Sequence, residues 1–179
     1  MKTILIIVAL TAVALIGFGA TYAMINATNH PIVDSLVSVD GDSLTAIIAG
    51  EVNYPGTYVL STGAKLLDLI NAAQGTTGNA DSLAFNTDYA IENKGTYYIA
   101  PLFDNSNTCS TSPIVKTNIN ADDVETMQAV AGFTKTVANA IASYRSSAPF
   151  KAIEELKNVS GIGSATFEKV KTKVTLRSA

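Results

Sequence analysis

The spacing of hydrophobic and polar positions changes near the middle of the chain. Between Leu44 and Ala100, short apolar runs compatible with β-strands are separated by turn-forming residues. From Asn118 onward, apolar residues recur every three or four positions. Short runs between turns are typical of strands, and the three-to-four spacing is typical of amphipathic helices. The pattern predicts an α+β part followed by a helical part.

A small sheet with one helix is predicted for the first part. The apolar segment 44–52 is followed by the turn signal Asn-Tyr-Pro-Gly and by a second β-compatible run at 57–60, which is typical of a hairpin. A further strand is expected at 96–100. Between them, apolar residues spaced i, i+3, i+4, i+7 mark one face of a helix: Leu66, Leu69, Ile70 and Ala73.

Four apolar stripes predict four short helices packed on one core in the second part. Asn120 is expected to cap the first of them, with Asp122 and Asp123 in its first turn. The stripes are Val124, Met127 and Val130; Val137, Ile141 and Tyr144; Phe150, Ile153 and Leu156; and Phe167, Val170 and Val174.

The segment Gly161-Ile162-Gly163 is predicted to form a tight hairpin between the last two helices. Glycines allow the backbone to turn sharply, and Ile162 is expected to fill the space between the helices. The following helix would begin with free N–H groups, which favour an anion such as phosphate. A related layout begins at Gly132, 29 residues earlier, which predicts a duplicated two-helix unit.

The N-terminus predicts an extracytoplasmic location. After Lys2, residues 3–25 form a 23-residue run without a charge, long enough to cross a bilayer as a helix. Thr21-Tyr22-Ala23 also fits a signal cleavage site, so an anchor and a cleaved signal both remain open. The charge distribution predicts a cytoplasmic N-terminus and an extracytoplasmic body.

Charge is divided unevenly along the chain. Residues 1–115 have a net charge of −6, whereas residues 116–179 have a net charge of +3. The modest basic excess accompanies the predicted hairpins, as a nucleic-acid contact requires. Cys109 is the single cysteine, so an intramolecular disulfide is excluded and a free thiol or an intermolecular bridge remains.

Two motifs resemble a known family. The residues from Asn118 to Val174, with the hairpins at Gly132 and Gly161, resemble the tandem helix-hairpin-helix domain of ComEA-type competence proteins. The segment 48–58, with its Gly-x-Val-x-x-Pro-Gly-x-Tyr pattern, resembles the soluble-ligand-binding (SLBB) β-grasp domain. The resemblance implies five segments: a transmembrane anchor or signal at 1–25, a tether at 26–43, a β-grasp domain at 44–103, a linker at 104–116 and a tandem helix-hairpin-helix domain at 117–177.

The resemblance implies a membrane-anchored receptor that captures double-stranded DNA for uptake in transformation. It also implies self-association or contact with the uptake machinery through the β-grasp domain. Hairpin amides would hold phosphate oxygens without reading bases. The implied amide contacts are Gly161, Ile162, Gly163, Ser164 and Ala165 in the second hairpin, and Gly132, Phe133, Thr134, Lys135 and Thr136 in the first. The implied charged contacts are Lys169, Lys171, Lys173, Lys135 and Arg145.

This sequence departs from the family pattern at both turns. The usual proline before each hairpin glycine is Ala131 in one unit and Ser160 in the other, and the second glycine of the first hairpin is Thr134. Ser164 and Ala165 stand where basic residues often follow the second turn. We expect these changes to weaken DNA binding.

A second hypothesis is a membrane-anchored surface scaffold or ligand-binding protein whose helical domain contacts proteins. Tyr54, Tyr58, Tyr97 and Tyr98 would then form a partner-binding face or cover the core of the β-grasp domain. An enzyme is not expected, because His30 is the only histidine and no phosphate-binding loop or dinucleotide fingerprint is present. No cofactor or resident metal is expected either, and Asp122, Asp123 and Glu125 are interpreted as charges in the first turn of a helix.

Overall fold

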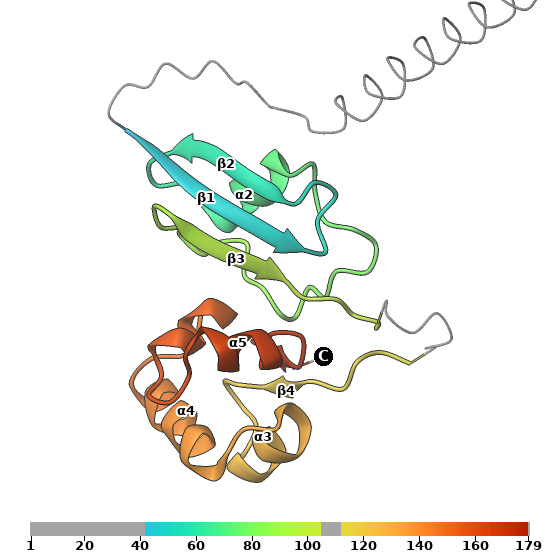
Figure 1. The fold of residues 1–179 in the computed structure, drawn as a ribbon, viewed down its shortest axis with the longest axis vertical. Coiled ribbons are helices and arrows are strands. Elements are labelled where there is room, and N and C mark those ends of the chain that lie inside the picture. The colour runs from blue at the N-terminus through green and yellow to red at the C-terminus, as the bar shows by residue number, and fades with distance from the viewer. Residues whose placement is uncertain (1–41, 105–111, 179) are drawn as a thin grey trace, which may run out of the picture. The chain divides into compact units, whose positions relative to one another are not determined.

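The computed structural model describes residues 42–104 and 112–178, which lie within one compact unit, Val39–Ala179. Its first part is a three-stranded sheet in the order β2-β1-β3 (Figure 1). The strands are β1 (Ser43–Gly50), β2 (Gly56–Ser61) and β3 (Gly95–Ile99). β1 pairs antiparallel with β2 and parallel with β3, so the predicted hairpin and the returning strand are both present.

Alternation along the strands builds the core of this part. Ala46 lies opposite Tyr58 in the β1–β2 ladder, and Leu44, Ala46 and Ile48 are buried while Ile47 is exposed. The helix α2 (Leu66–Ala72) packs Leu66, Leu69 and Ile70 into the same core. The predicted helical stripe therefore faces the buried side of the sheet, because residues two apart on a strand share one face.

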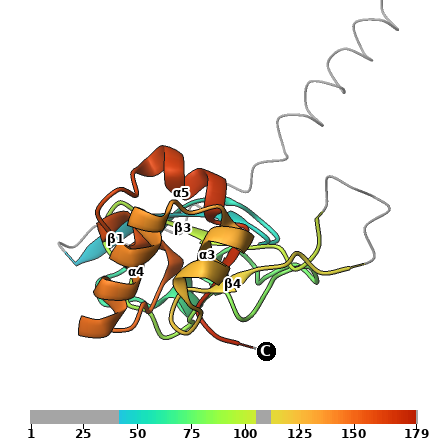
Figure 2. The same cartoon turned by 90° about the horizontal axis from the view of Figure 1, so that it is seen from below.

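The second part contains two helical hairpins around a separate core (Figure 2). Its helices are α3 (Val124–Ala131), α4 (Lys135–Ser147), the 3₁₀-helix η1 (Ile153–Asn158) and α5 (Ser164–Val170). The third element is a 3₁₀-helix, not an α-helix. The apolar positions Phe150, Ile153 and Leu156, the last two of which lie in η1, are spaced by three, and that spacing matches the three residues per turn of a 3₁₀-helix.

A short parallel ladder corrects the expectation of a purely helical second part. β4 (Thr117–Asn118) pairs with β5 (Val174–Thr175). Val174 was predicted to extend the last helical stripe, but α5 ends at Val170 and Val174 is buried in β5. This ladder pairs the beginning of the helical part with its end.

The predicted cap at Asn120 is also wrong. The N-cap of α3 lies three residues later, at Asp123, whose carboxylate accepts the Thr126 N–H at 2.7 Å. The Asn120 side chain instead links distant segments by bonding to the backbone of Phe150 and to the carbonyl of Leu176. Asp122 accepts from the Thr117 hydroxyl and the Asn118 N–H, so it holds β4.

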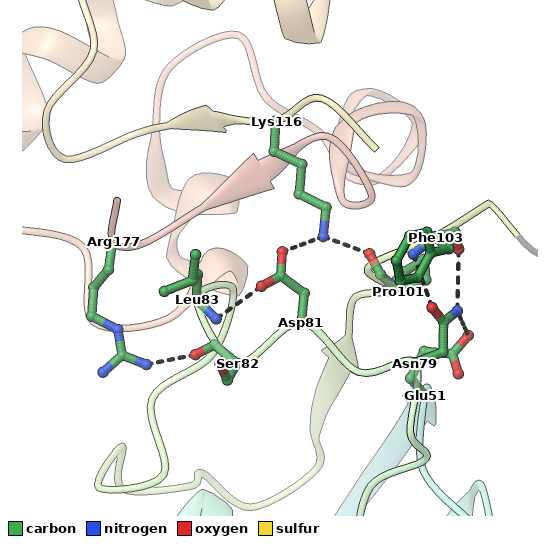
Figure 3. A network of polar contacts seen from close by, with 9 residues as sticks. All are labelled: Glu51, Asn79, Asp81, Ser82, Leu83, Pro101, Phe103, Lys116 and Arg177. Carbon is green, nitrogen blue, oxygen red and sulfur yellow. Dashed lines mark hydrogen bonds and ion pairs between the residues drawn. The ribbon is translucent and has the colours of Figure 1, made fainter. Parts of the chain in front are cut away.

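A polar network joins the sheet to the helical part (Figure 3). The Lys116 ammonium group donates to Asp81 Oδ2 and to the Pro101 carbonyl, both at 2.5 Å. The Lys116 and Asp81 side chains are only 4% and 6% exposed. Arg177 donates to the Ser82 carbonyl at 2.6 Å. Residues before and after the helical hairpins are thus bonded to the loop that follows α2.

Within 42–104 and 112–178, no helix has the length and apolar character needed to span a membrane. The predicted anchor at 1–25 and Cys109 lie outside those ranges.

Candidate nucleic-acid interface

The second hairpin forms the turn that its sequence predicts. Gly161 has φ +90°, a left-handed conformation that glycine adopts without strain. Ile162 is 3% exposed and packs into the helical core between the two arms. Gly163 is the N-cap of α5 and has no side chain to cap the helix, so the turn leaves the first amides of α5 open to an outside acceptor.

The first hairpin repeats this geometry with one difference. Gly132 has φ +76°, and Phe133 is buried in the position that Ile162 occupies in the other unit. Thr134 replaces the second glycine and is the N-cap of α4, where its hydroxyl accepts the Val137 N–H at 3.3 Å. The first hairpin therefore satisfies one of its own turn amides, whereas the second hairpin does not.

The two turns meet at a cavity of about 350 Å³. It is lined by Gly132, Phe133 and Thr134 from the first hairpin and by Gly161 from the second. Two exposed lysines, Lys169 and Lys173, also line the cavity, and neither forms a salt bridge within the described part of the chain. The arrangement places two backbone turns and two ammonium groups around one space, which suits an extended anion.

Other predicted contacts lie outside this cavity. Arg145 donates to the Ile119 carbonyl at 3.0 Å, so its guanidinium group ties α4 to the segment after β4. Lys171 pairs with Glu168 and lies over the Tyr98 ring, 4.2 Å from its centroid. The remaining predicted residues are exposed around the helix starts: Lys135, Thr136, Ser164 and Ala165.

Four residues lining the cavity were not predicted: Ala131, Val137, Thr166 and Val170. The internal repeat contains the signal for two of them. Val137 and Thr166 are 29 residues apart, the same interval that separates Gly132 from Gly161, and each lies three residues after the N-cap of its helix. Aligning the two hairpins by their N-caps would have shown that these two residues occupy equivalent positions beside the turns.

The tyrosines proposed as a partner-binding face are mostly engaged within the protein. Tyr97 is 4% exposed, and its hydroxyl accepts the Glu92 N–H at 2.8 Å. Tyr58 donates its hydroxyl to the Tyr54 carbonyl at 2.6 Å, which closes the turn between β1 and β2. Tyr98 is covered by Lys171, and Tyr54 is 42% exposed. These side chains therefore do not form one open aromatic surface.

Glu154 is a partly buried carboxyl group where the sheet meets the second hairpin. Its Oε1 accepts the Tyr98 N–H at 2.7 Å. Burial, which disfavours the charged form, raises the pKa of Glu154 to about 7 from its ordinary value of 4.5. The nearby charges of Lys157 and Glu155 act in opposite directions and are smaller effects.

We expect Glu154 to make stability fall as pH rises from about 4.5 to about 7. The folded state binds its proton more tightly than the unfolded state, so the stabilisation is complete below pH 4.5 and is lost by about pH 7. The full difference is about 3 kcal/mol. Urea unfolding of the unchanged chain and of Glu154→Gln, at pH 5 and pH 8, measures it. An equal pH dependence in both proteins would contradict the assignment, and Glu125→Gln on the exposed side of α3 is the control.

Comparison with known proteins agrees with this geometry. Residues 112–175 match a family model described as a helix-hairpin-helix motif. The chain is 28% identical over 162 residues to ComE operon protein 1 of Bacillus subtilis (strain 168), covering 84% of this chain and 79% of that protein. The resemblance to ComEA-type competence proteins is confirmed.

The helix-hairpin-helix match covers both turns that line the cavity, from Gly132 to Gly163, together with Lys169 and Lys173. The alignment with the ComE operon relative is long enough to include part of the sheet as well, because it spans more than the helical part alone. The ComEA-type resemblance therefore extends beyond the hairpin motif.

Proposed function

We propose that this chain is a sequence-nonspecific receptor for double-stranded DNA, used in DNA uptake during transformation. The hairpin turns would bind phosphate oxygens through backbone amides, and Lys169 and Lys173 would neutralise neighbouring phosphates. Contacts of this kind position a protein on a duplex without reading its sequence. A receptor for uptake of arbitrary DNA needs that indifference. We propose binding alone as the role, with no chemical step and no cofactor.

The observation that carries this proposal is the cavity shared by the two turns. Gly132 and Gly161 line it from different hairpins, and both have left-handed backbone conformations. Two lysines without an ion-pair partner in the described ranges lie at the same cavity. A scaffold that used the helical part only for protein contacts would have no need to leave both ammonium groups unpaired beside the two turns, the second of which has no side-chain cap.

The location outside the cytoplasm is part of the same proposal and rests on sequence. The uncharged run at 3–25 supports a membrane anchor, and Lys2 supports a cytoplasmic N-terminus. Proteolysis of intact cells, followed by detection of the C-terminal part, tests it. Protection of that part in intact cells but not in lysed cells would contradict an extracytoplasmic body.

We further infer that the sheet is a β-grasp domain. A central strand, β1, pairs antiparallel with its hairpin partner and parallel with β3, and α2 packs on one face. The other face exposes Ile47 and Val59, which are 40% and 55% accessible. The part of that face around Ile47 and Val59, which Tyr98 and the helical part leave exposed, is available for self-association or for contact with the uptake machinery. A monomeric mass for the full-length chain at all accessible concentrations would count against self-association.

The salt dependence of DNA binding tests the receptor function. We expect the full-length chain, in a mild detergent, to bind duplexes of unrelated sequence with equal affinity. The slope of log K against log salt is expected at about −2 to −3, because the cavity lysines and turns account for only two or three phosphates. Fluorescence anisotropy between about 50 and 200 mM salt measures it. No binding at the lowest salt would overturn the function and favour the scaffold.

A further inference from the structure

Tyr98 on β3 contacts both arms of the second hairpin. Its backbone N–H donates to the Glu154 carboxylate on η1 at 2.7 Å. Its ring lies 4.2 Å from the ammonium group of Lys171, the residue that ends α5. Since η1 leads into the turn at Gly161 and α5 leads out of it, one residue of the sheet holds the hairpin from both sides.

The position of Tyr98 on β3 explains how it can do this. Successive side chains of a strand alternate between faces, so Tyr97 and Ile99 enter the sheet core while Tyr98 faces the opposite side. Tyr98 is partly buried and packs against the core of the helical part. β3 is also an edge strand of the sheet, and its contacts include η1. The Tyr98 N–H is thus paired outside the sheet.

The second hairpin needs such support more than the first. η1 has six residues and α5 has seven, whereas α3 has eight and α4 has thirteen. Helices of six or seven residues are unstable on their own in water, because few hydrogen bonds offset the cost of nucleation. The direction of these short arms therefore depends on contacts from outside the hairpin.

We propose that Tyr98 is a positioning residue for the turn at Gly161–Gly163, so that the sheet sets how this turn meets DNA. The inference rests on the proposed DNA-binding function. Gly161 and Gly132 both line the shared cavity, and movement of either arm changes the spacing between the two turns. Two phosphates of one duplex have a fixed separation. Loss of the contacts to Tyr98 therefore lowers affinity without removing any group that touches DNA.

Substitutions at Glu154 distinguish the effect of hairpin position on DNA affinity from the effect of charge. At pH 8, above its pKa of about 7, Glu154 is mostly ionised, and deleting a negative charge normally strengthens binding to DNA. Glu154→Ala deletes the acceptor of the Tyr98 N–H, and we expect it to weaken binding by about fivefold. Glu154→Gln deletes the same charge but keeps an acceptor oxygen, so its affinity is expected to equal or exceed that of the unchanged chain. Glu125→Ala, on an exposed position of α3, is the charge control and is expected to behave like Glu154→Gln.

Substitution of Tyr98 itself provides the second readout. Tyr98→Ala is expected to weaken binding by about fivefold, and Tyr98→Phe to retain it because the ring remains beneath Lys171. Tyr58→Ala removes a tyrosine from the other face of the same sheet and is the matched control. All variants are compared as full-length chains by anisotropy, with urea unfolding to confirm folding.

Two results would overturn the inference: undiminished affinity in Glu154→Ala and Tyr98→Ala, or an equal loss in Tyr58→Ala. Absence of binding by the unchanged chain is a separate result. It would overturn the receptor function, and the inference with it.

Discussion

Replacing Gly163 by threonine should weaken DNA binding by about ten- to a hundredfold while the protein stays folded and at least as stable. Gly163 has φ −89° and ψ 179°, an extended conformation open to any residue. A Cβ added there would meet no atom within 4 Å. The fold therefore does not require glycine at this position. A loss of binding would then reflect a lost contact with DNA, because the fold itself is unchanged.

The chain already contains the comparison, because Thr134 occupies the same place in the first hairpin. Its hydroxyl accepts the amide three residues ahead, that of Val137. Threonine at Gly163 is expected to accept the Thr166 amide in the same way, which stabilises α5 slightly. The substitution thus places a side chain in the path of a phosphate and also occupies one of the donors. We expect the salt slope to fall by about one as that phosphate contact is lost.

The reciprocal change, Thr134→Gly, is the matched control. It opens the first turn, so affinity is expected to rise severalfold while the free energy of unfolding falls by a few tenths of a kcal/mol. Anisotropy titrations and urea unfolding of both variants test the pair. If Gly163→Thr bound duplex DNA like the unchanged chain, the second turn would not be a phosphate contact. Gly161 is a poorer test, since its φ of +90° and the Val137 methyl 3.0 Å from an added Cβ would strain the fold itself.

Local features of this fold could be predicted from sequence. The turns at Gly132 and Gly161, and the buried Phe133 and Ile162 between their arms, depend on residues that are neighbours in the chain. The strands and α2 were likewise visible as alternation and as i, i+3, i+4 spacing. β4 and β5 could not be predicted, because ladders of two residues show no period.

The roles of the charged residues were harder to predict from the sequence, because their partners are distant along the chain. Lys171 was expected at DNA but lies over Tyr98, 73 positions earlier. Arg145 bonds to the carbonyl of Ile119. The sequence does not show whether a lysine or arginine near a hairpin faces solvent or packs against a neighbouring domain. Only the packing of the sheet against the helical part separates Lys171 from Lys169 and Lys173, which line the cavity.

Replacing Lys116 by methionine should destabilise the protein by about 3–5 kcal/mol. Methionine keeps the length and most of the volume of the side chain but removes the ammonium group. The Asp81 carboxylate, whose side chain is 6% exposed, would then be buried without its cation. Among the described residues, the Asp81 carboxylate would retain only the Leu83 N–H, at 3.0 Å, as a donor. The Pro101 carbonyl would lose the Lys116 donor as well.

The exposed pair Lys65–Asp88 provides the control for this experiment. Its two atoms are 2.8 Å apart, but its side chains are 53% and 79% exposed, so water replaces the lost partner. Lys65→Met is therefore expected to leave the urea midpoint within error, while Lys116→Met lowers it strongly at an unchanged m value. Adding Asp81→Leu to Lys116→Met should recover most of the loss, because it removes the unpaired charge. If Lys116→Met proved as harmless as Lys65→Met, Asp81 and Lys116 would not be the buried link between sheet and hairpins.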